Sequence, residues 1–373
     1  MKKILFITST LEKGGLTNVV YDLVKNIDKA VFDVSVLTLS PEPEKSRLAD
    51  FEKLLDVKLL SLGLSRISGM LRGKSGTQEL VDEIKPDIIH SHGIRADGIV
   101  SKLKTNALKV ATVHSFLEED YSMTYGRLKG KLMCAADISS LKKMSVCVGV
   151  SQSVAIYLIE RFRLKNAVGI PNGVDTEQFF PVCEEKKVIL REKLSMPKDK
   201  KIVLSTGSLS DRKNPMFLIE QWRLAGMLLS DYQLYIIGIG NLYKECVNAA
   251  AGSDNIRIVG RKDNVEEYLQ AGDFYVSASK SEGISLSILE AAACGLPLLL
   301  TDIPPFKEVL SYNENMGRCY REGDGKNFVE TFMELVKADK EILRNAAVET
   351  MRKDFSVGKM IERYQKIYTD GII

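Results

Sequence analysis

Short apolar runs alternate with longer amphipathic stretches through the first half of the chain. The runs predicted to form buried strands are residues 3–8, 34–39, 57–60, 88–89, 108–113 and 146–150. Residues 18–27 place Val19, Val20, Leu23 and Ile27 on one face of a predicted helix. Strands that alternate with helices in this way predict βαβ units and a parallel sheet.

The same alternation begins again after Pro171. Here the predicted strands are residues 202–205, 234–237, 256–259, 274–276 and 298–301, and helical stretches such as 215–221 and 264–269 lie between them. Residues 182–200 are polar and suit a linker with a short helix. The sequence therefore predicts an α/β protein with a second parallel, doubly wound sheet.

The length of 373 residues also favours two domains over one oversized core. We place the boundary near residues 165–185, which gives an N-terminal domain of residues 1–170 and a C-terminal domain of residues 171–373. Apolar side chains at helical spacing predict a last helix at about residues 357–369. We expect this helix to cross back and pack toward the N-terminal domain.

Composition and charge narrow the class of protein. Hydrophobic residues make up 45% and charged residues 27% of the chain, as in ordinary globular proteins. No apolar run reaches the ~18 residues of a membrane-spanning helix, and the first apolar run is too short for a signal peptide, so a cytoplasmic protein is expected. The six cysteines form no C-x-x-C pair, which favours free buried thiols over disulfides or zinc.

The net charge differs between the two halves. Residues 1–170 carry 25 Lys and Arg against 19 Asp and Glu, whereas the remainder carries 27 against 30. The basic excess gathers at residues 64–74, with Arg66, Arg72 and Lys74, and at residues 125–133, with Arg127, Lys129 and Lys131. Apolar side chains accompany both groups, so they could dock on anionic lipid or on a lipid-diphosphate acceptor. A mobile polar loop and a solvated helix face are the alternatives.

A phosphate-binding loop is predicted at residues 279–285, between a strand and the helical run 286–294. Gly283 allows close approach of the backbone, and the amides of Ile284, Ser285 and Leu286 have no partner within a new helix. These donors suit a diphosphate. Glu282 and Glu290 would repel phosphate and are better acceptors for hydroxyl groups, although a helix cap and a solvated helix residue remain the simpler interpretations.

A second loop, residues 206–215, follows another predicted strand and precedes Pro215, a favourable first residue of a helix. Lys213 could reach a phosphate placed between the two helix starts, or it could be an ordinary solvated lysine. Gly238 and Gly240 form a third glycine turn that is weak evidence alone. Because no G-x-G-x-x-G follows the first strand of either half, a dehydrogenase is disfavoured.

Several motifs in order resemble the retaining glycosyltransferases of family 4. The motifs of the second half are Ile170–Asp175 with Phe180-Pro181, Gly207–Leu209 with Lys213-Asn214, Val259-Gly260, Tyr268-Leu269, Ala271–Asp273, Ser281–Gly283, Leu289–Ala291 and Gly295–Pro297. Those of the first half are Gly14-Gly15, Pro86–His92, Thr112–His114 and Val150-Ser151. Each motif is weak alone, but the ordered set spans nearly the whole chain.

The resemblance implies two facing Rossmann-like domains, the GT-B fold. The C-terminal domain would hold a nucleotide-sugar and the N-terminal domain the acceptor. In this family the residue matching Glu282 contacts the donor sugar, the one matching Glu290 holds the ribose, and the one matching Lys213 grips the diphosphate. The resemblance further implies that the amides of residues 284–286 complete the clamp and that Gly260, Arg261 and Lys262 line the base.

The three histidines of the chain, His90, His92 and His114, all lie in the first half. A lone histidine after a strand is most often a satisfied core residue. The resemblance instead implies that His114 touches the transferred sugar, and it leaves His92 as a candidate acceptor-side residue. Gly15, after the first strand, would lie beneath the diphosphate or the sugar, with a simple turn as the alternative.

One position departs from the family pattern. Ser208 stands where the family usually has an arginine, and a well-placed donor of this kind contributes roughly 3 kcal/mol to a transition state. Our hypothesis is that Arg212, beside Lys213, takes over this role. No metal or other cofactor is expected, because the chain lacks Asp-x-Asp and lysine, amides and helix dipoles can stabilise the leaving group.

The expected function is transfer of a hexosyl residue from a nucleoside diphosphate sugar, with UDP favoured, to a glycan or lipid-linked glycan. A role in bacterial surface polysaccharide synthesis and peripheral contact with an anionic membrane are expected, and no nucleic acid partner is. Two alternatives stay open. One is an isomerase like the nucleotide-sugar 2-epimerases, and the other is a protein that binds a nucleotide-sugar without turnover.

Overall fold

The computed structural model describes residues 1–371, and these form two compact units. The first contains Met1–Asn172 together with the residues from Val357 onward, and the second contains Gly173–Ser356. The last helix, which the sequence-based division counted with residues 171–373, is therefore part of the first unit. Each unit is a parallel α/β layer structure, which confirms the predicted fold class.

The first unit is built on a seven-stranded sheet with the order β3-β2-β1-β4-β5-β6-β7, and all neighbouring strands are parallel. The strands are β1 (Lys2–Thr8), β2 (Phe32–Thr38), β3 (Val57–Ser61), β4 (Ile88–His92), β5 (Leu108–Val113), β6 (Val146–Gly149) and β7 (Ala167–Gly169). The sequence pattern missed β7, which has three residues and pairs with β6 at the sheet edge. The strand order reverses between β1 and β4. The chain therefore leaves these two neighbouring strands in opposite directions along the sheet.

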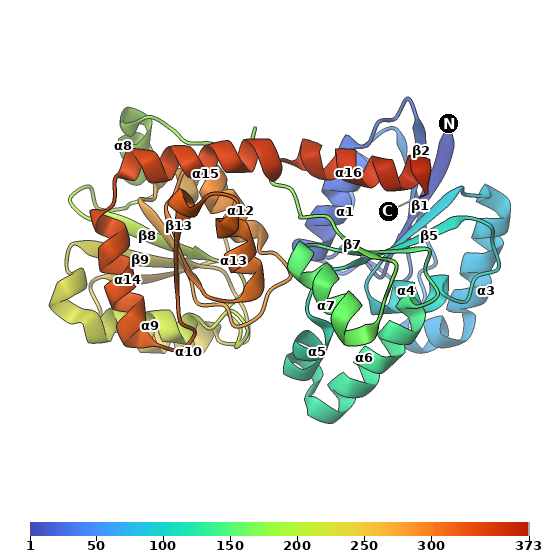
Figure 1. Ribbon diagram of the computed structural model, residues 1–373, viewed down its shortest axis with the longest axis horizontal. Helices are drawn as coiled ribbons and strands as arrows, with labels where there is room; N and C mark the ends of the chain where they lie inside the picture. Colours follow the sequence, from blue (N-terminus) through green and yellow to red (C-terminus); the bar gives the residue numbers. More distant parts are fainter. Residues whose placement is uncertain (372–373) are drawn as a thin grey trace. The chain divides into compact units, whose positions relative to one another are not determined.

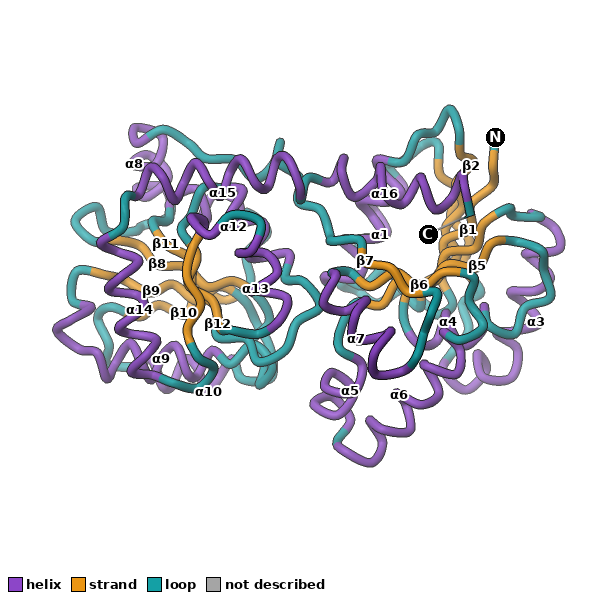
Figure 2. Tube along the Cα trace, viewed as in Figure 1, coloured by secondary structure: helices purple, strands orange, loops and turns teal. Residues whose placement is uncertain are grey.

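Helices cover both faces of this sheet (Figures 1 and 2). They are α1 (Gly15–Asn26), α2 (Leu48–Glu52), α3 (Arg66–Ile84), α4 (Ile94–Val100), α5 (Leu117–Tyr125), α6 (Arg127–Leu141), α7 (Gln152–Phe162) and α16 (Val357–Asp370). α16 packs against α1, and α4 packs against both α3 and α6. The apolar face predicted for α16 is buried, including Met360, Ile361 and Tyr364.

The second unit has a six-stranded parallel sheet with the order β10-β9-β8-β11-β12-β13. Its strands are β8 (Lys201–Thr206), β9 (Tyr232–Ile237), β10 (Ile256–Gly260), β11 (Phe274–Ser277), β12 (Leu298–Thr301) and β13 (Gly317–Tyr320). The sequence pattern missed β13, whose residues GRCY form no apolar run. The strand order reverses between β8 and β11.

The helices of the second unit also cover both faces of its sheet (Figure 1). They are α8 (Glu184–Lys193), α9 (Pro215–Ala225), α10 (Tyr243–Ala250), α11 (Val265–Ala271), α12 (Leu286–Ala293), α13 (Pro304–Ser311), α14 (Gly325–Lys337) and α15 (Lys340–Asp354). Aromatic rings fill the core between the sheet and α9 and α14. Trp222 meets Phe332 with ring centroids 5.7 Å apart, and Phe332 meets Phe274 at 5.6 Å.

A buried ion cluster ties α8 to the sheet of the second unit. Asp273 lies 2.7 Å from Lys187 Nζ, 2.5 Å from Arg191 Nη2 and 3.2 Å from Lys340 Nζ, and it accepts the backbone N–H of Ile202. Burial alone would raise the pKa of Asp273, but these cations and hydrogen bonds hold it well below its usual range. The short helix expected within residues 182–200 thus anchors the first strand of the sheet.

All six cysteines are free thiols, in agreement with the prediction. The prediction that they are buried was wrong for Cys183, which is exposed, and only partly right for Cys319, which is half-buried. Cys183 precedes α8 in the segment that leads into the second sheet, where the chain runs over the surface.

Candidate active site

The loops after β8 and β11 lie side by side in the second unit because these strands are paired neighbours. Phe274 pairs with Val203 and Tyr275 with Leu204. Strand order reverses at this point, and ligands of open parallel sheets bind at the carboxyl ends of the strands at such a point. The backbone N–H of Lys280 donates to the carbonyl of Arg212 at 2.8 Å, so the two loops are also joined directly.

The two loops bring four of the predicted site residues into one cluster. Arg212 Nη1 lies 2.6 Å from Glu282 Oε2, and Lys213 Nζ lies 2.6 Å from Glu282 Oε1. Lys213 also donates to Ser285 Oγ at 3.2 Å. We call Arg212, Lys213, Glu282 and Ser285 the switch-point cluster. Its members lie up to 73 residues apart in the sequence. All four nevertheless belong to the two loops that the sequence predicted to hold phosphate.

The charge balance of the switch-point cluster favours an anion. The Glu282 side chain is 6% exposed, whereas those of Lys213 and Arg212 are 17% and 29% exposed. Burial alone would raise the pKa of Glu282, but Lys213 and Arg212 lower it, so the carboxylate is ionised at neutral pH. Two cations against one carboxylate leave one excess positive charge at the loops. The start of α12 adds backbone N–H groups that have no acceptor within the helix itself, and the positive end of a helix dipole.

Glycines shape the floor of this site. A Cβ on Gly238 would lie 1.8 Å from the carbonyl oxygen of Gly207, and one on Gly240 would lie 2.2 Å from that of Leu209. Gly207 itself has a φ of +140°, and a Cβ there would lie 3.3 Å from Lys213 Cε. The glycine turn after β9 therefore packs against the loop after β8, and it supports the loop that carries Lys213.

Apart from Ser285, the other donor-site residues predicted in the second unit do not belong to the switch-point cluster. Ser208 is exposed and pairs with Ser210, with 3.3 Å between their hydroxyl oxygens. Glu290 is half-buried and is the fifth residue of α12, about one turn from the start of that helix. Arg261 and Lys262 are exposed after β10, an edge strand two positions from β8. Gly283, Ile284, Ser285 and Leu286 form the turn into α12, as predicted.

The corresponding point of the first unit lies between β1 and β4. Gly15 begins α1 after β1, is exposed, and has nothing within 4 Å of where a Cβ would lie, so packing does not require a glycine. His92 ends β4 and pairs in register with Thr8 of β1 and Thr112 of β5. His114 follows β5, and its Nε2 lies 3.1 Å from Nδ1 of His92.

The histidines of the first unit are neutral. Burial lowers the pKa of His114 to about 4, and burial with the nearby His114 lowers that of His90 to about 3. Burial, His90 and His114 together hold the pKa of His92 well below its usual value. His90 is the satisfied core residue of the three, because its nitrogens lie 2.7 Å from the hydroxyls of Tyr368 and Thr112. Sequence reasoning missed these hydroxyl partners, since Tyr368 is 278 residues away.

Family models match both halves of the chain. The model described as Glycosyltransferase Family 4 matches residues 13–178, and the model described as Glycosyl transferases group 1 matches residues 186–354. Together they cover most of the chain, and most of the first match falls in the first unit and all of the second match in the second unit. The chain belongs to glycosyltransferase family 4.

Relatives and solved structures agree with this assignment. A UDP-Gal:alpha-D-GlcNAc-diphosphoundecaprenol alpha-1,3-galactosyltransferase of Escherichia coli is 24% identical over 92% of this chain and 90% of its own length. The O-antigen biosynthesis glycosyltransferase WclY of the same species is 23% identical over 99% of this chain and 98% of its own. The structure of Anabaena Alr3699/HepE in complex with UDP and glucose has a TM-score of 0.82 at 15% identity, covering 99% of this chain and all of that one.

In this family 4 glycosyltransferase, both basic segments predicted to contact an acceptor or a membrane are exposed helix starts. Arg72 and Lys74 lie on α3, and Arg127, Lys129 and Lys131 lie on α6. The side chain of Arg66 lies outside the described residues. The mobile-loop alternative for residues 64–74 was wrong, because Ser65 caps α3 by accepting the backbone N–H of Ser68. The large apolar side chains between these cations are 72–84% exposed: Ile67, Met70, Leu71, Leu128 and Leu132.

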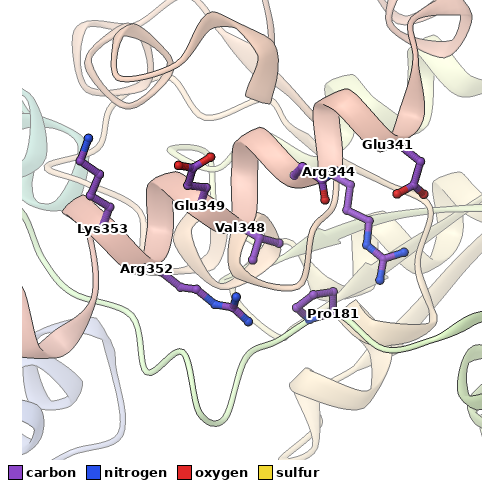
Figure 3. Close-up of a pocket in the computed structure, with 8 residues that line it drawn as sticks. Pro181, Glu341, Arg344, Val348, Glu349, Arg352 and Lys353 are labelled. Atoms are coloured by element: carbon purple, nitrogen blue, oxygen red, sulfur yellow. The ribbon is translucent and has the colours of Figure 1, made fainter.

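A groove that includes neither loop of the switch-point cluster lies elsewhere in the second unit. It has a volume of about 770 Å³ and is formed by Pro181 and one side of α15, where Arg344, Arg352 and Lys353 alternate with Glu341 and Glu349 (Figure 3). None of the predicted site residues lines it. A cavity of about 10 Å³ at the ends of β8 and β11 is lined by Ser208, Lys213, Ser277 and Ser279 among others.

Residues 1–371 contain no helix long and apolar enough to cross a bilayer. The same residues contain no group of three or more His, Cys, Asp or Glu side chains placed to hold a metal ion.

Proposed function

We propose that this glycosyltransferase moves a hexosyl residue from a nucleoside diphosphate sugar to a glycan or lipid-linked glycan with retention of anomeric configuration. The observation that carries the proposal is the switch-point cluster, where Arg212 and Lys213 meet Glu282 at the start of α12. Excess positive charge beside free helix amides is chemistry for a diphosphate leaving group. UDP is the favoured nucleotide, since a relative is named for a UDP-sugar and a similar structure contains UDP.

Each side chain then has a role in stabilising departure of the diphosphate. Lys213 and the amides of residues 284–286 bind its phosphate oxygens as negative charge develops. Arg212 serves in place of the arginine that the family has at Ser208. Glu282 accepts a hydroxyl of the transferred sugar and Glu290 the ribose hydroxyls, because an ionised carboxylate is a strong acceptor.

Retention is proposed to proceed by attack on the same face from which the diphosphate leaves. The C1–O bond to the diphosphate breaks, the acceptor oxygen forms a new bond to C1, and the departing phosphate takes the acceptor's proton. A glycosidase-like pair of carboxylates does not fit, because Glu290 is assigned to the ribose and lies about one turn inside α12, beyond the loop that holds Glu282. No divalent cation is required in this scheme.

A transfer assay with UDP-sugars in EDTA tests the proposal and its two alternatives. The proposal predicts release of the nucleoside diphosphate that depends on an acceptor, and proton NMR of the first product should show the anomeric configuration of the donor. An epimerase would instead convert the donor sugar without any acceptor. A binding protein would bind the nucleotide-sugar and release no product, and inversion would contradict the proposed mechanism.

We further propose that the acceptor is lipid-linked and that the first unit docks on an anionic membrane. The galactosyltransferase of Escherichia coli that resembles this chain is named for a diphosphoundecaprenol acceptor. The starts of α3 and α6 combine five exposed cations with exposed leucine, isoleucine and methionine, which is the composition of an interfacial helix. Each cation near an anionic surface adds about 1 kcal/mol to binding.

Vesicle flotation tests the membrane proposal. The protein should float with vesicles that contain anionic lipid at low salt and remain in solution with zwitterionic vesicles. Leu128→Ser with Leu132→Ser should weaken flotation, whereas Leu224→Ser, at a leucine of the second unit that is 73% exposed, should not. Equal binding to both vesicle types would contradict the role of the cations. Failure of flotation alone would remove the membrane claim and leave the donor site untouched.

A further inference from the structure

His92 and His114 share one hydrogen bond, and its direction follows from the rest of the site. Nδ1 of His92 and Nε2 of His114 are 3.1 Å apart. Both rings are neutral at pH 7, because burial lowers the pKa of each. Each neutral imidazole has one N–H and one lone pair, so one of these two nitrogens donates and the other accepts.

The second nitrogen of His92 decides which one donates. Nε2 of His92 is buried and has no hydrogen-bond partner among the described residues. Placing the proton on Nε2 would leave a buried N–H without an acceptor, which is among the rarest and costliest arrangements in folded proteins. Placing it on Nδ1 uses the N–H in the bond to His114 and leaves only a lone pair unpaired. His92 is therefore the donor.

The consequence for His114 concerns its free nitrogen. Because Nε2 of His114 accepts from His92, its own proton must reside on Nδ1. The ring is half-buried, and no described residue is recorded as a partner of Nδ1. His114 thus presents an N–H donor in a fixed orientation. We propose that His92 is a positioning residue that holds His114 in the Nδ1–H form, ready to donate to an oxygen of the transferred sugar.

The strands and α16 hold His92 in place for this role. His92 stacks on Phe6 with centroids 6.2 Å apart, and its ring lies 4.2 Å from that of His90, two residues earlier on β4. His90 is fixed at both nitrogens by Tyr368 of α16 and Thr112 of β5. Thr112 in turn contacts the hydroxyl of Tyr364 at 3.0 Å. These contacts pack His92 between fixed neighbours, so its Nδ1 keeps its position beside Nε2 of His114.

Nitrogen-15 NMR of histidine-labelled protein tests the proposal without any substrate. The chain has three histidines, so long-range correlations from ring carbons' protons yield three resolvable patterns, and His114→Asn identifies the one from His114. We expect His114 to show a protonated Nδ1 and an unprotonated Nε2 at pH 7, and His92 to show the same. A protonated Nε2 on His114 in the wild-type protein would overturn the proposal.

Two variants of His92 test its control of the tautomer. His92→Asn keeps an N–H donor near the position of Nδ1 and should preserve Nδ1–H on His114. His92→Phe keeps a planar ring without a donor, and the proton of His114 should move to Nε2, the form that free histidine prefers. An unchanged His114 pattern in His92→Phe would overturn the proposal.

The link to catalysis rests on the proposed function and has its own readout. Transfer by His92→Phe should fall about tenfold in kcat with the KM for the donor nearly unchanged, and His92→Asn should restore most of it. The expected tautomer with no transfer by the wild-type protein would contradict the proposed function and leave the assignment of the proton standing. Equal kcat in His92→Phe and wild type would contradict the positioning role.

Discussion

The two units have the same architecture but place opposite kinds of chemistry at the point where strand order reverses. In the second unit the loops after β8 and β11 carry Arg212, Lys213 and Glu282 as a partly exposed charged cluster. In the first unit His92 ends β4 and His114 follows β5, and burial keeps both histidines neutral. The difference matches the proposed function, in which the second unit binds the diphosphate of the donor and the first unit contacts uncharged hydroxyl groups.

The second unit contains two kinds of charged cluster, one that joins helices to the sheet and one that joins the two loops of the site. Asp273 is 3% exposed and is surrounded by Lys187, Arg191 and Lys340, which join α8 and α15 to the sheet. Glu282 joins only the two loops of the site. Breaking the first cluster should therefore cost stability, whereas breaking the second should cost function.

The largest expected effect is on the Asp273 cluster. Asp273→Asn leaves three cations near an uncharged side chain, and the free energy of unfolding of the second unit should fall by about 3–5 kcal/mol. Trp222, the one tryptophan of the chain, is buried in this unit, so its fluorescence during denaturant unfolding reports the loss. Glu192→Gln, in an exposed ion pair of α8 with Lys198, should change stability by less than about 1 kcal/mol.

The next largest effect concerns turnover. Lys213→Ala should lower kcat by about 10²–10³, because it removes a cation placed for the leaving diphosphate, with little change in Trp222 unfolding. Lys280→Ala is the matched control: this exposed lysine contacts Arg212 through its backbone N–H, which the substitution keeps. Equal losses in the two variants would show that the overall charge of the loop matters and not the position of Lys213.

Arg212 should have a smaller effect. If it replaces the arginine that the family has at Ser208, Arg212→Ala should lower donor affinity and turnover by about tenfold, or 1.4 kcal/mol. Its contact with the carbonyl of Ser281, at 2.9 Å, means that part of the loss is loop order. Arg212→Lys keeps the charge and should recover part of it. Unchanged affinity and turnover in Arg212→Ala would exclude the replacement hypothesis.

The smallest expected effect is a pH dependence of the stability of the first unit, which comes from its histidine His114. The pKa of His114 is about 4 in the folded chain and about 6.5 when unfolded, so the unfolded chain binds more protons between these values. His114 therefore contributes stability above about pH 6.5 that is lost as the pH falls toward 4. The buried carboxyl of Asp137, whose pKa burial raises to about 6, acts in the opposite sense in the same unit.

A comparison of variants isolates the histidine contribution. The difference in unfolding temperature between wild type and His114→Asn should be constant above pH 7. Between pH 6.5 and 4 the wild type should lose more stability than the variant, because only the wild type carries the His114 side chain. Circular dichroism melts at matched pH values measure it. A difference that is the same at pH 5 and pH 7 would show that His114 is not held neutral by burial.

Much of the fold could be predicted because buried parallel strands leave a clear apolar pattern. β7 and β13 were missed since three residues in one case, and the mixed sequence GRCY in the other, carry no periodic signal. The role of α8 was also hidden. Lys187 and Arg191 look like solvated helix residues until they meet Asp273, more than 80 residues away.

Part of the candidate site could be predicted, because loops that follow the carboxyl ends of parallel strands lie along the same edge of the sheet. Lys213 and Glu282 follow strands that became adjacent, and their loops could be identified from glycine and helix-start signals alone. The bond between His92 and His114 could not, because it depends on the register of β4 and β5 and on Tyr368 of α16 holding His90. Periodicity identifies strands but does not identify which side chains meet across them.

The most direct test of the charged site in the second unit is calorimetric titration of UDP, GDP, ADP and dTDP into the protein with EDTA present. Wild type and Lys280→Ala should bind one class of nucleotide with equal affinity, and Lys213→Ala should bind it at least tenfold more weakly. Equal affinity in wild type and Lys213→Ala, or binding that appears only when a divalent cation is added, would contradict the account.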